Sequence, residues 1–221
     1  MPARGPVHRE QGGSVGGVDG GSAAGVGHVP FGLDAVASRP QVPPGAGGVH
    51  VVVDGWGPLA EEASAQLRRC RVAVQGGRHA ADGAEVALGL DGRRPAAVVL
   101  VAEGRRPGWV GAPWQARGVP HLPIVLQVDR VVVGPLVLPG RTACLECAAP
   151  DRSEVSGPGA VPPESVVLAA AVATVTVLAV LRGNPGLGGI STEIGLSGLS
   201  VTHRLYNPVP GCRCARGRMA G

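Results

Sequence analysis

The chain has 221 residues, enough for one ordinary domain with a modest core, and its net charge of +4 is dispersed along the sequence. With one Phe, one Tyr and three Trp, aromatic side chains are too few to interleave the basic residues as stacking platforms, so we expect no nucleic-acid partner. All 20 basic residues are Arg, and glycine and proline make up about a quarter of the chain. The core must therefore consist mainly of Val, Leu and Ala.

Residues 1–48 are rich in Gly, Pro and Ser and show no sustained apolar periodicity. Such a segment buries too little apolar surface to offset its ordering entropy, so we expect it to be disordered or loosely docked. A short apolar patch at residues 29–36 is the part that would pack onto the remainder. The N-terminus lacks the apolar region of a secretory signal peptide. Five cysteines, four of them in two close pairs, favour a reduced, cytoplasmic compartment over a disulfide framework.

The second part, residues 49–221, alternates apolar runs with helix-compatible stretches. A helix is expected over residues 58–69, because Pro58 suits the first turn of a helix. Strands alternating with helices indicate βαβ units and a largely parallel sheet. Further short strands are expected near the first cysteine pair and between residues 187 and 206. The strands expected before that pair cover residues 51–53, 71–75, 95–102, 123–127, 131–133 and 136–138, with a helical or irregular segment over residues 109–117.

The strongest helix signal covers residues 164–182, which carry no charge between Ser165 and Leu181. This run is slightly shorter than the about 20 residues of a typical membrane span. A helix that is apolar all round is also typical of a protein core or a subunit interface, and we expect that role here. Ala170, Ala171 and Ala173 form a small-residue face that another helix can approach closely, which suggests a two-fold dimer.

Four cysteines form two close pairs: two residues separate Cys144 from Cys147, and one separates Cys212 from Cys214. Zinc prefers four soft ligands in a tetrahedron, and closed all-cysteine sites are structural. We therefore expect one structural Zn²⁺ bound by all four. Unliganded thiols or a redox Cys-x-x-Cys motif are the alternatives, although the first pair does not open a helix after a thioredoxin-like strand. The fifth cysteine, Cys70, is expected to be a small buried residue.

A glycine loop lies between the first expected strand and the first expected helix. Gly55, Gly57 and Ala60 match the pattern G-x-G-x-x-A in the strand–loop–helix context that a dinucleotide or ATP site requires. The acidic residue that holds a ribose about 20 residues further on is missing, since Gln75 and two glycines occupy that place. A glycine turn retained for close packing of strand and helix is an equally good interpretation of the loop.

Several segments together resemble the E1-like (ThiF-type) family. More narrowly, they are similar to the ThiF-type partners of YcaO cyclodehydratases, which make thiazole and oxazole heterocycles in ribosomal peptides. The resemblance covers roughly residues 50–216 and implies an α/β, truncated Rossmann-like E1 fold with a mainly parallel sheet and a four-cysteine zinc site. The segments that carry it are residues 121–126, residues 133–147 with the first cysteine pair, the Ala-rich helix, and the closing residues 210–214 with the second pair.

The chain departs from that family where adenylation would take place. Family members that adenylate place a Lys and an Arg on the triphosphate and an Asp on magnesium, and this chain contains no lysine. The part before residue 50 is also too short for a full winged-helix domain that binds a leader peptide. The resemblance therefore implies a degenerate, non-catalytic member that scaffolds a YcaO-type cyclodehydratase or presents the precursor peptide.

The expected cofactor is structural Zn²⁺, and we do not expect ATP binding. The expected partners are a YcaO-type cyclodehydratase and a precursor peptide, with a homodimer or hetero-oligomer as the assembly and no membrane association. One alternative is an ATP-using adenylyltransferase or cyclodehydratase subunit in which Arg residues replace the missing Lys. A further alternative is a zinc protein tethered to a membrane by residues 165–181.

Overall fold

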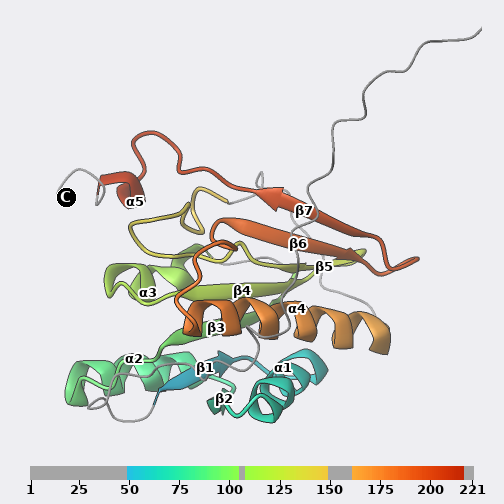
Figure 1. Ribbon diagram of the computed structural model, residues 1–221, viewed down its shortest axis with the longest axis horizontal. Helices are drawn as coiled ribbons and strands as arrows, with labels where there is room; N and C mark the ends of the chain where they lie inside the picture. Colours follow the sequence, from blue (N-terminus) through green and yellow to red (C-terminus); the bar gives the residue numbers. More distant parts are fainter. Residues whose placement is uncertain (1–48, 105–107, 149–160, 217–221) are drawn as a thin grey trace, which may run out of the picture. The chain divides into compact units, whose positions relative to one another are not determined.

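The computed structural model describes residues 49–104, 108–148 and 161–216, so the expected N-terminal segment, residues 1–48, lies outside the described residues. Within them, seven strands form one sheet in the order β2-β1-β3-β4-β5-β6-β7 (Figure 1). The strands are β1 (His50–Asp54), β2 (Ala73–Gly77), β3 (Ala97–Glu103), β4 (His121–Leu126), β5 (Arg130–Val133), β6 (Ile190–Gly195) and β7 (Val201–Leu205). The helices are α1 (Pro58–Arg69), α2 (Ala80–Asp91), η2 (Gly108–Gly111), α3 (Ala112–Ala116), α4 (Pro163–Leu181) and α5 (Arg213–Arg216).

The sheet has a parallel part and an antiparallel part. Strands β2, β1, β3 and β4 run parallel, which confirms the βαβ units expected from the sequence. Strands β5, β6 and β7 continue the sheet antiparallel to their neighbours. The β4–β5 and β6–β7 connections contain only a few residues, and a parallel pair needs a crossover of about a dozen residues or more. Antiparallel pairing is therefore the geometry open to these two strand pairs.

Helices cover both faces of the parallel strands, and alternate residues of each strand point to opposite layers. Val51 and Val53 of β1 belong to the core under α1 and α4, whereas Val52 between them belongs to the core under α2 and α3. Trp114 of α3 is 1% exposed and is the largest side chain of the second core. Burial on both faces explains why β1, β3 and β4 appear in the sequence as continuous apolar runs, whereas the edge strand β2 is mostly exposed.

Helix α2 is the element that the sequence pattern did not reveal. It contains Gly83 and Gly89, and only a few of its residues are buried. Glycine is a poor helix former, so local propensity gives little signal here. Its N-terminus is fixed by tertiary structure instead, because Oδ1 of Asp54 at the end of β1 accepts a hydrogen bond from the N–H of Ala81 at 3.1 Å.

Helix α4 packs beside α1 on the same face of the sheet. By length and composition it is apolar enough to cross a membrane, but 44% of it is buried inside the protein. Ala170 and Ala173 are fully buried in the same cluster as Ala63 and Leu67 of α1, and the Nε2 of Gln66 donates to the carbonyl oxygen of Val167 at 3.3 Å. Ala170 and Ala173 are thus buried within the same chain, which corrects the expectation that they face another subunit, whereas Ala171 is only half-buried.

Cys70 is exposed, so its expected burial is wrong. It follows the last residue of α1 at the helix C-terminus, where the chain turns through Arg71 with φ of 62° before entering β2. A position at the end of a helix, in a turn, projects from the core, and apolar character alone does not predict that.

Candidate metal centre

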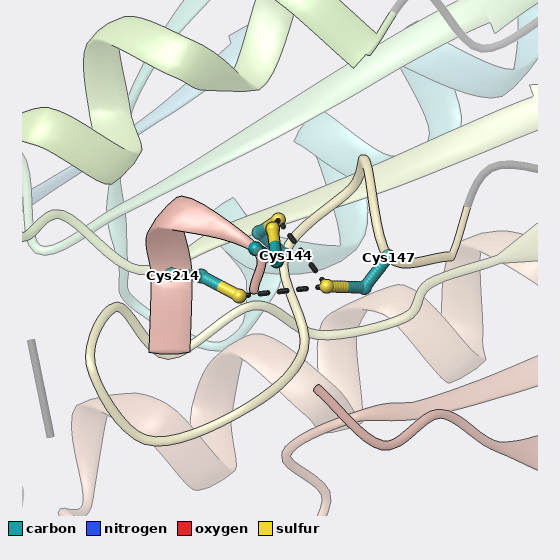
Figure 2. A group of neighbouring side chains, drawn as sticks. Cys144, Cys147 and Cys214 are labelled. Carbon is teal, nitrogen blue, oxygen red and sulfur yellow. Dashed lines mark hydrogen bonds between the residues drawn. The ribbon is translucent and has the colours of Figure 1, made fainter. Parts of the chain in front are cut away.

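The four cysteines predicted as metal ligands lie together in the structure. Their sulfur atoms are all within 4.8 Å of one another. The Sγ of Cys144 is 3.7 Å from that of Cys147 and 3.6 Å from that of Cys212, and the Sγ atoms of Cys147 and Cys214 are 3.4 Å apart (Figure 2). Four sulfurs bound to one zinc ion at about 2.3 Å stand about 3.8 Å apart at the corners of a tetrahedron. The observed separations fit that arrangement.

The first pair is presented by a turn that begins directly after Leu138. The N–H of Leu138 donates to the hydroxyl oxygen of Thr142 at 2.9 Å, and the N–H of Thr142 donates back to the carbonyl oxygen of Leu138 at 3.1 Å. The N–H of Ala148 then donates to the carbonyl oxygen of Cys144 at 3.2 Å, which closes the loop around the pair. Two thiols separated by two residues are thereby directed to the same point.

The second pair sits where the chain turns from β7 into the short helix α5. The N–H of Cys212 donates to the carbonyl oxygen of Val209 at 3.1 Å across a turn in which Gly211 has φ of 84°. A left-handed conformation of this kind favours glycine, so Gly211 is the residue that permits the bend. Cys214 lies two residues further, inside α5, and is buried. The bend therefore brings both sulfurs of the pair against the first pair.

Burial and hydrogen bonds shift the pKa values of the thiols in the cluster in different directions. Burial, the largest effect, raises the pKa of the Cys144 thiol and also that of the Cys214 thiol. Burial acts to raise the pKa of Cys147 as well, but the N–H of Val209, 3.4 Å from its sulfur, and the neighbouring cysteines lower it by more. Several thiolates this close repel one another without a cation. A divalent metal ion removes that repulsion and deprotonates coordinating thiols.

The donor set selects the kind of metal. Four sulfurs and no oxygen suit a soft or borderline ion in tetrahedral geometry, which fits Zn²⁺ and excludes hard ions such as Mg²⁺ and Ca²⁺. All four positions are taken by protein ligands, so such an ion would have a structural role. The backbone N–H of Val209 is the contributor that the sequence motif did not identify, because a main-chain donor leaves no residue signature.

The glycine loop lies where the sequence places it, between β1 and α1, with Pro58 in the first turn of the helix. Gly55 has φ of 134°, and a Cβ added there would stand 2.8 Å from the Cβ and 2.9 Å from the carbonyl oxygen of Val101. Gly57 has φ of 83°, but a Cβ there would meet nothing within 4 Å. Ala60 is 5% exposed in the core under α1. Close packing against β3 thus accounts for Gly55 without a nucleotide.

An open groove of about 290 Å³ lies beside this loop and includes all three loop residues, Gly55, Gly57 and Ala60. Arg68 and Arg78 supply positive charge, and Glu61 in the first turn of α1 supplies a negative charge where a phosphate would approach. The guanidinium of Arg78 lies over the ring of Trp56, 4.8 Å from its centroid. The groove therefore offers two cations and one opposing anion; its other lining residues are Ser64, Gly76 and Gly77.

Comparison with solved structures identifies the fold. The structure of E. coli MccB with succinimide matches with a TM-score of 0.55 and 15% identity, over 75% of this chain and 66% of MccB. A heterocyclase in complex with substrate and cofactor matches with a TM-score of 0.54 and 12% identity, over 76% of this chain and 25% of the heterocyclase. The heterocyclase TruD matches with a TM-score of 0.53 and 14% identity, over 75% of this chain and 27% of TruD.

These likenesses confirm the expected α/β fold of the E1-like type, at sequence identities that speak for the fold alone. The chain spans 66% of the length of MccB and about a quarter of each heterocyclase. No protein-family model and no curated protein matches the sequence.

Proposed function

We propose that this chain is a zinc-stabilised, non-catalytic E1-like partner protein in a complex that modifies ribosomal peptides by forming azolines. In this role it scaffolds a YcaO-type cyclodehydratase or presents the precursor peptide to it. The observation that carries the proposal is the combination of an E1-like fold, shared with heterocyclases, and a closed four-sulfur site on the same chain. A closed site has no position left for a substrate, so its metal stabilises and does not react.

The zinc ion would be bound by Cys144, Cys147, Cys212 and Cys214. It would join the turn after Leu138 to the start of α5, two segments separated by more than 60 residues, as the Cys147–Cys214 contact shows. Metal-binding free energy at such a site becomes folding free energy. Helix α4 and strands β6 and β7 lie between these two segments in the sequence. The ion would thereby help to hold these three elements in place.

The surroundings of Gly55, Gly57 and Ala60 support a role without ATP chemistry. The loop is packed against Val101. A carboxylate oxygen of Asp54, at the end of β1, accepts a hydrogen bond from the start of α2. The groove beside the loop is lined by two arginines and by the negatively charged Glu61, and the chain contains no lysine to meet a phosphate as a point charge. Phosphoryl and adenylyl transfer depends on concentrated positive charge, which these residues do not supply.

The second candidate is an ATP-using adenylyltransferase or cyclodehydratase subunit. The observation in its favour is that Arg68 and Arg78 line an open groove that also includes Gly57 at the N-terminus of α1, because a helix N-terminus attracts anions. Solved neighbours include MccB with ATP, so the shared fold accommodates this chemistry elsewhere.

Calorimetric titration with ATP and Mg²⁺, followed by ATP–pyrophosphate exchange with and without a precursor peptide, separates the two candidates. The partner role predicts no saturable heat and exchange at background. Exchange well above background that is lost in Gly57→Asp would refute the partner role, because a carboxylate at this open loop position repels phosphate without clashing. Gly92→Asp, at another left-handed glycine with open space, is the matched control.

The assembly we propose is cytoplasmic and is a homodimer or hetero-oligomer without membrane association. Support for association comes from the outer side of α4, where Val167 is 54% and Val175 is 60% exposed. The half-buried Ala171 lies between them at helical spacing, so the three form one apolar stripe. An uncharged stripe of this kind is typical of protein–protein contact.

A further inference from the structure

A cavity of about 510 Å³ lies between α3 and the loop of the first cysteine pair, outside the groove beside Gly55. Small residues leave the space: Gly111, Ala112 and Ala116 on one side and Gly140 on the other. Leu145 adds an apolar wall, and Cys144 and Cys214 of the metal centre form part of the lining. Two exposed charged residues, Glu146 and Arg213, complete it. The volume falls within the range of about 300–1,000 Å³ that is usual for small-molecule sites.

Two of the lining residues carry polar atoms without partners. Nε2 of His121 and Oε1 of Gln115 are buried and find no hydrogen-bond partner in the described part of the chain. The Nδ1 of His121 lies 3.0 Å from the carbonyl oxygen of Val119, and a carbonyl only accepts, so Nδ1 carries the proton. The other ring nitrogen, Nε2, is therefore an acceptor. Burial lowers the pKa of His121 to about 4, so the ring stays neutral at physiological pH.

Both unpartnered atoms are acceptors, and each is expensive to leave unsatisfied in the protein interior. Gln115 is half-buried on α3 and contributes to the lining of the cavity. A bound ligand can supply the hydrogen-bond partner that such buried polar atoms lack. The buried part of the lining thus combines apolar walls with two unpaired hydrogen-bond acceptors, and a ligand that donates a hydrogen bond would pair one of them.

An anion does not suit these acceptors, and a saturated hydrocarbon leaves them unpaired. A planar aromatic group with one N–H or O–H fits both properties, because it brings a large apolar body and a single donor. We propose that the cavity binds an indole or phenol group through a hydrogen bond donated to Gln115 or His121. The group belongs either to a free small molecule or to a tryptophan or tyrosine side chain of a peptide. The second source rests on the proposed function, whereas the site itself does not.

The test uses the zinc-loaded full-length chain and calorimetric titration with three probes. Indole is expected to bind about tenfold more tightly than 1-methylindole, which has the same ring without the donor. Equal affinities, or no binding of any probe, would overturn the proposal. N-acetyl-tryptophanamide identifies the source: affinity close to that of indole assigns a peptide side chain, and binding of indole alone assigns a free molecule.

Three substitutions in the lining test whether the probes bind in this cavity. Gln115→Leu keeps the side-chain size, removes the acceptor and should reduce the preference for indole over 1-methylindole at least about threefold. Gln75→Leu, on the exposed strand β2, is the matched control and should change nothing. Ala116→Leu fills the cavity from an exposed helix position and should abolish binding while the chain remains folded. Retained binding in Ala116→Leu would place the ligand elsewhere and contradict the assignment. His121→Phe tests the second acceptor.

Discussion

The sulfur atom of Cys147 lies 3.4 Å from that of Cys214, although the two residues are 67 positions apart in the sequence. The separation is too long for a disulfide, whose sulfurs stand about 2.05 Å apart, and it is close to the spacing of two ligands on one ion. The Cys144–Cys212 contact at 3.6 Å crosses between the same two segments. A bound metal is therefore a cross-link of the fold, and its removal should act on folding.

Substituting one ligand should release the metal and destabilise the chain. Purified protein is expected to contain one zinc ion per chain by elemental analysis, and Cys144→Ser well below one. The loss of unfolding free energy should exceed about 4 kcal/mol, because metal loss belongs to the small class of changes with effects of that size. Cys70→Ser is the control, since Cys70 is exposed and outside the cluster, and it should leave zinc content and stability unchanged. Full stability of Cys144→Ser without metal would contradict a structural role for zinc.

The two loop glycines should differ in their tolerance of a methyl group. Gly55→Ala places a Cβ within 3 Å of two Val101 atoms at a strained φ, so it should cost more than about 3 kcal/mol of unfolding free energy. Gly57→Ala meets only the backbone strain and should cost about 1 kcal/mol. Urea unfolding of both variants measures the difference. Equal losses of unfolding free energy would show that contact with Val101 is not the reason why position 55 requires glycine.

Stability should fall below neutral pH through His121. Its folded pKa of about 4 lies below the ordinary value of 6.5 because burial disfavours the charged ring. The unfolded chain therefore binds the extra proton first, and stability is lost as the pH falls from 6.5 towards 4. The contribution of His121 to the free energy of unfolding should fall by about 2 kcal/mol between pH 7 and pH 5.

Urea unfolding at these two pH values checks this for the native chain and for His121→Phe. The comparison cancels any acid effect on the cysteine cluster, because both proteins contain it. His79 is exposed, so His79→Asn should retain the native slope. An unchanged pH slope in folded His121→Phe would rule out His121 as the titrating group.

Association should depend on the exposed stripe of α4. Light scattering is expected to show a dimer without detergent, and Val175→Glu should shift it to monomer, because a charge in an apolar contact is costly when unpaired. Leu90→Glu on α2 is the control: Leu90 is 78% exposed, against 60% for Val175, and lies on another helix. A native monomer would contradict self-association through this helix.

The sequence was sufficient for features that depend on local pattern. Continuous apolar runs located the parallel strands β1, β3 and β4, Pro58 marked the start of α1, and cysteine spacing identified all four members of the cluster. Each of these signals is contained in a few neighbouring residues. The features that tertiary contacts determine were not predictable in this way.

Three of those features illustrate the limit. Helix α2 starts where Asp54 accepts from Ala81, a contact across 27 positions that no local propensity encodes. Cys70 is exposed because of its place in a helix-terminal turn, although its residue type is often buried. The alanines of α4 were recognised as a helix-packing surface, but only the fold shows that Ala170 and Ala173 are buried in the same cluster as α1 of the same chain.

Reconstituted heterocyclisation tests the central claim most directly. The native chain is combined with a YcaO-type cyclodehydratase and a Cys/Ser/Thr-rich precursor peptide encoded beside it, with ATP and Mg²⁺, and the peptide mass is followed. A non-catalytic partner predicts loss of water from the peptide only when this chain is present, with the same rate for Arg78→Ala, whose guanidinium lines the groove beside the glycine loop. Dehydration that proceeds equally well without the chain, or that is abolished by Arg78→Ala, would contradict the account.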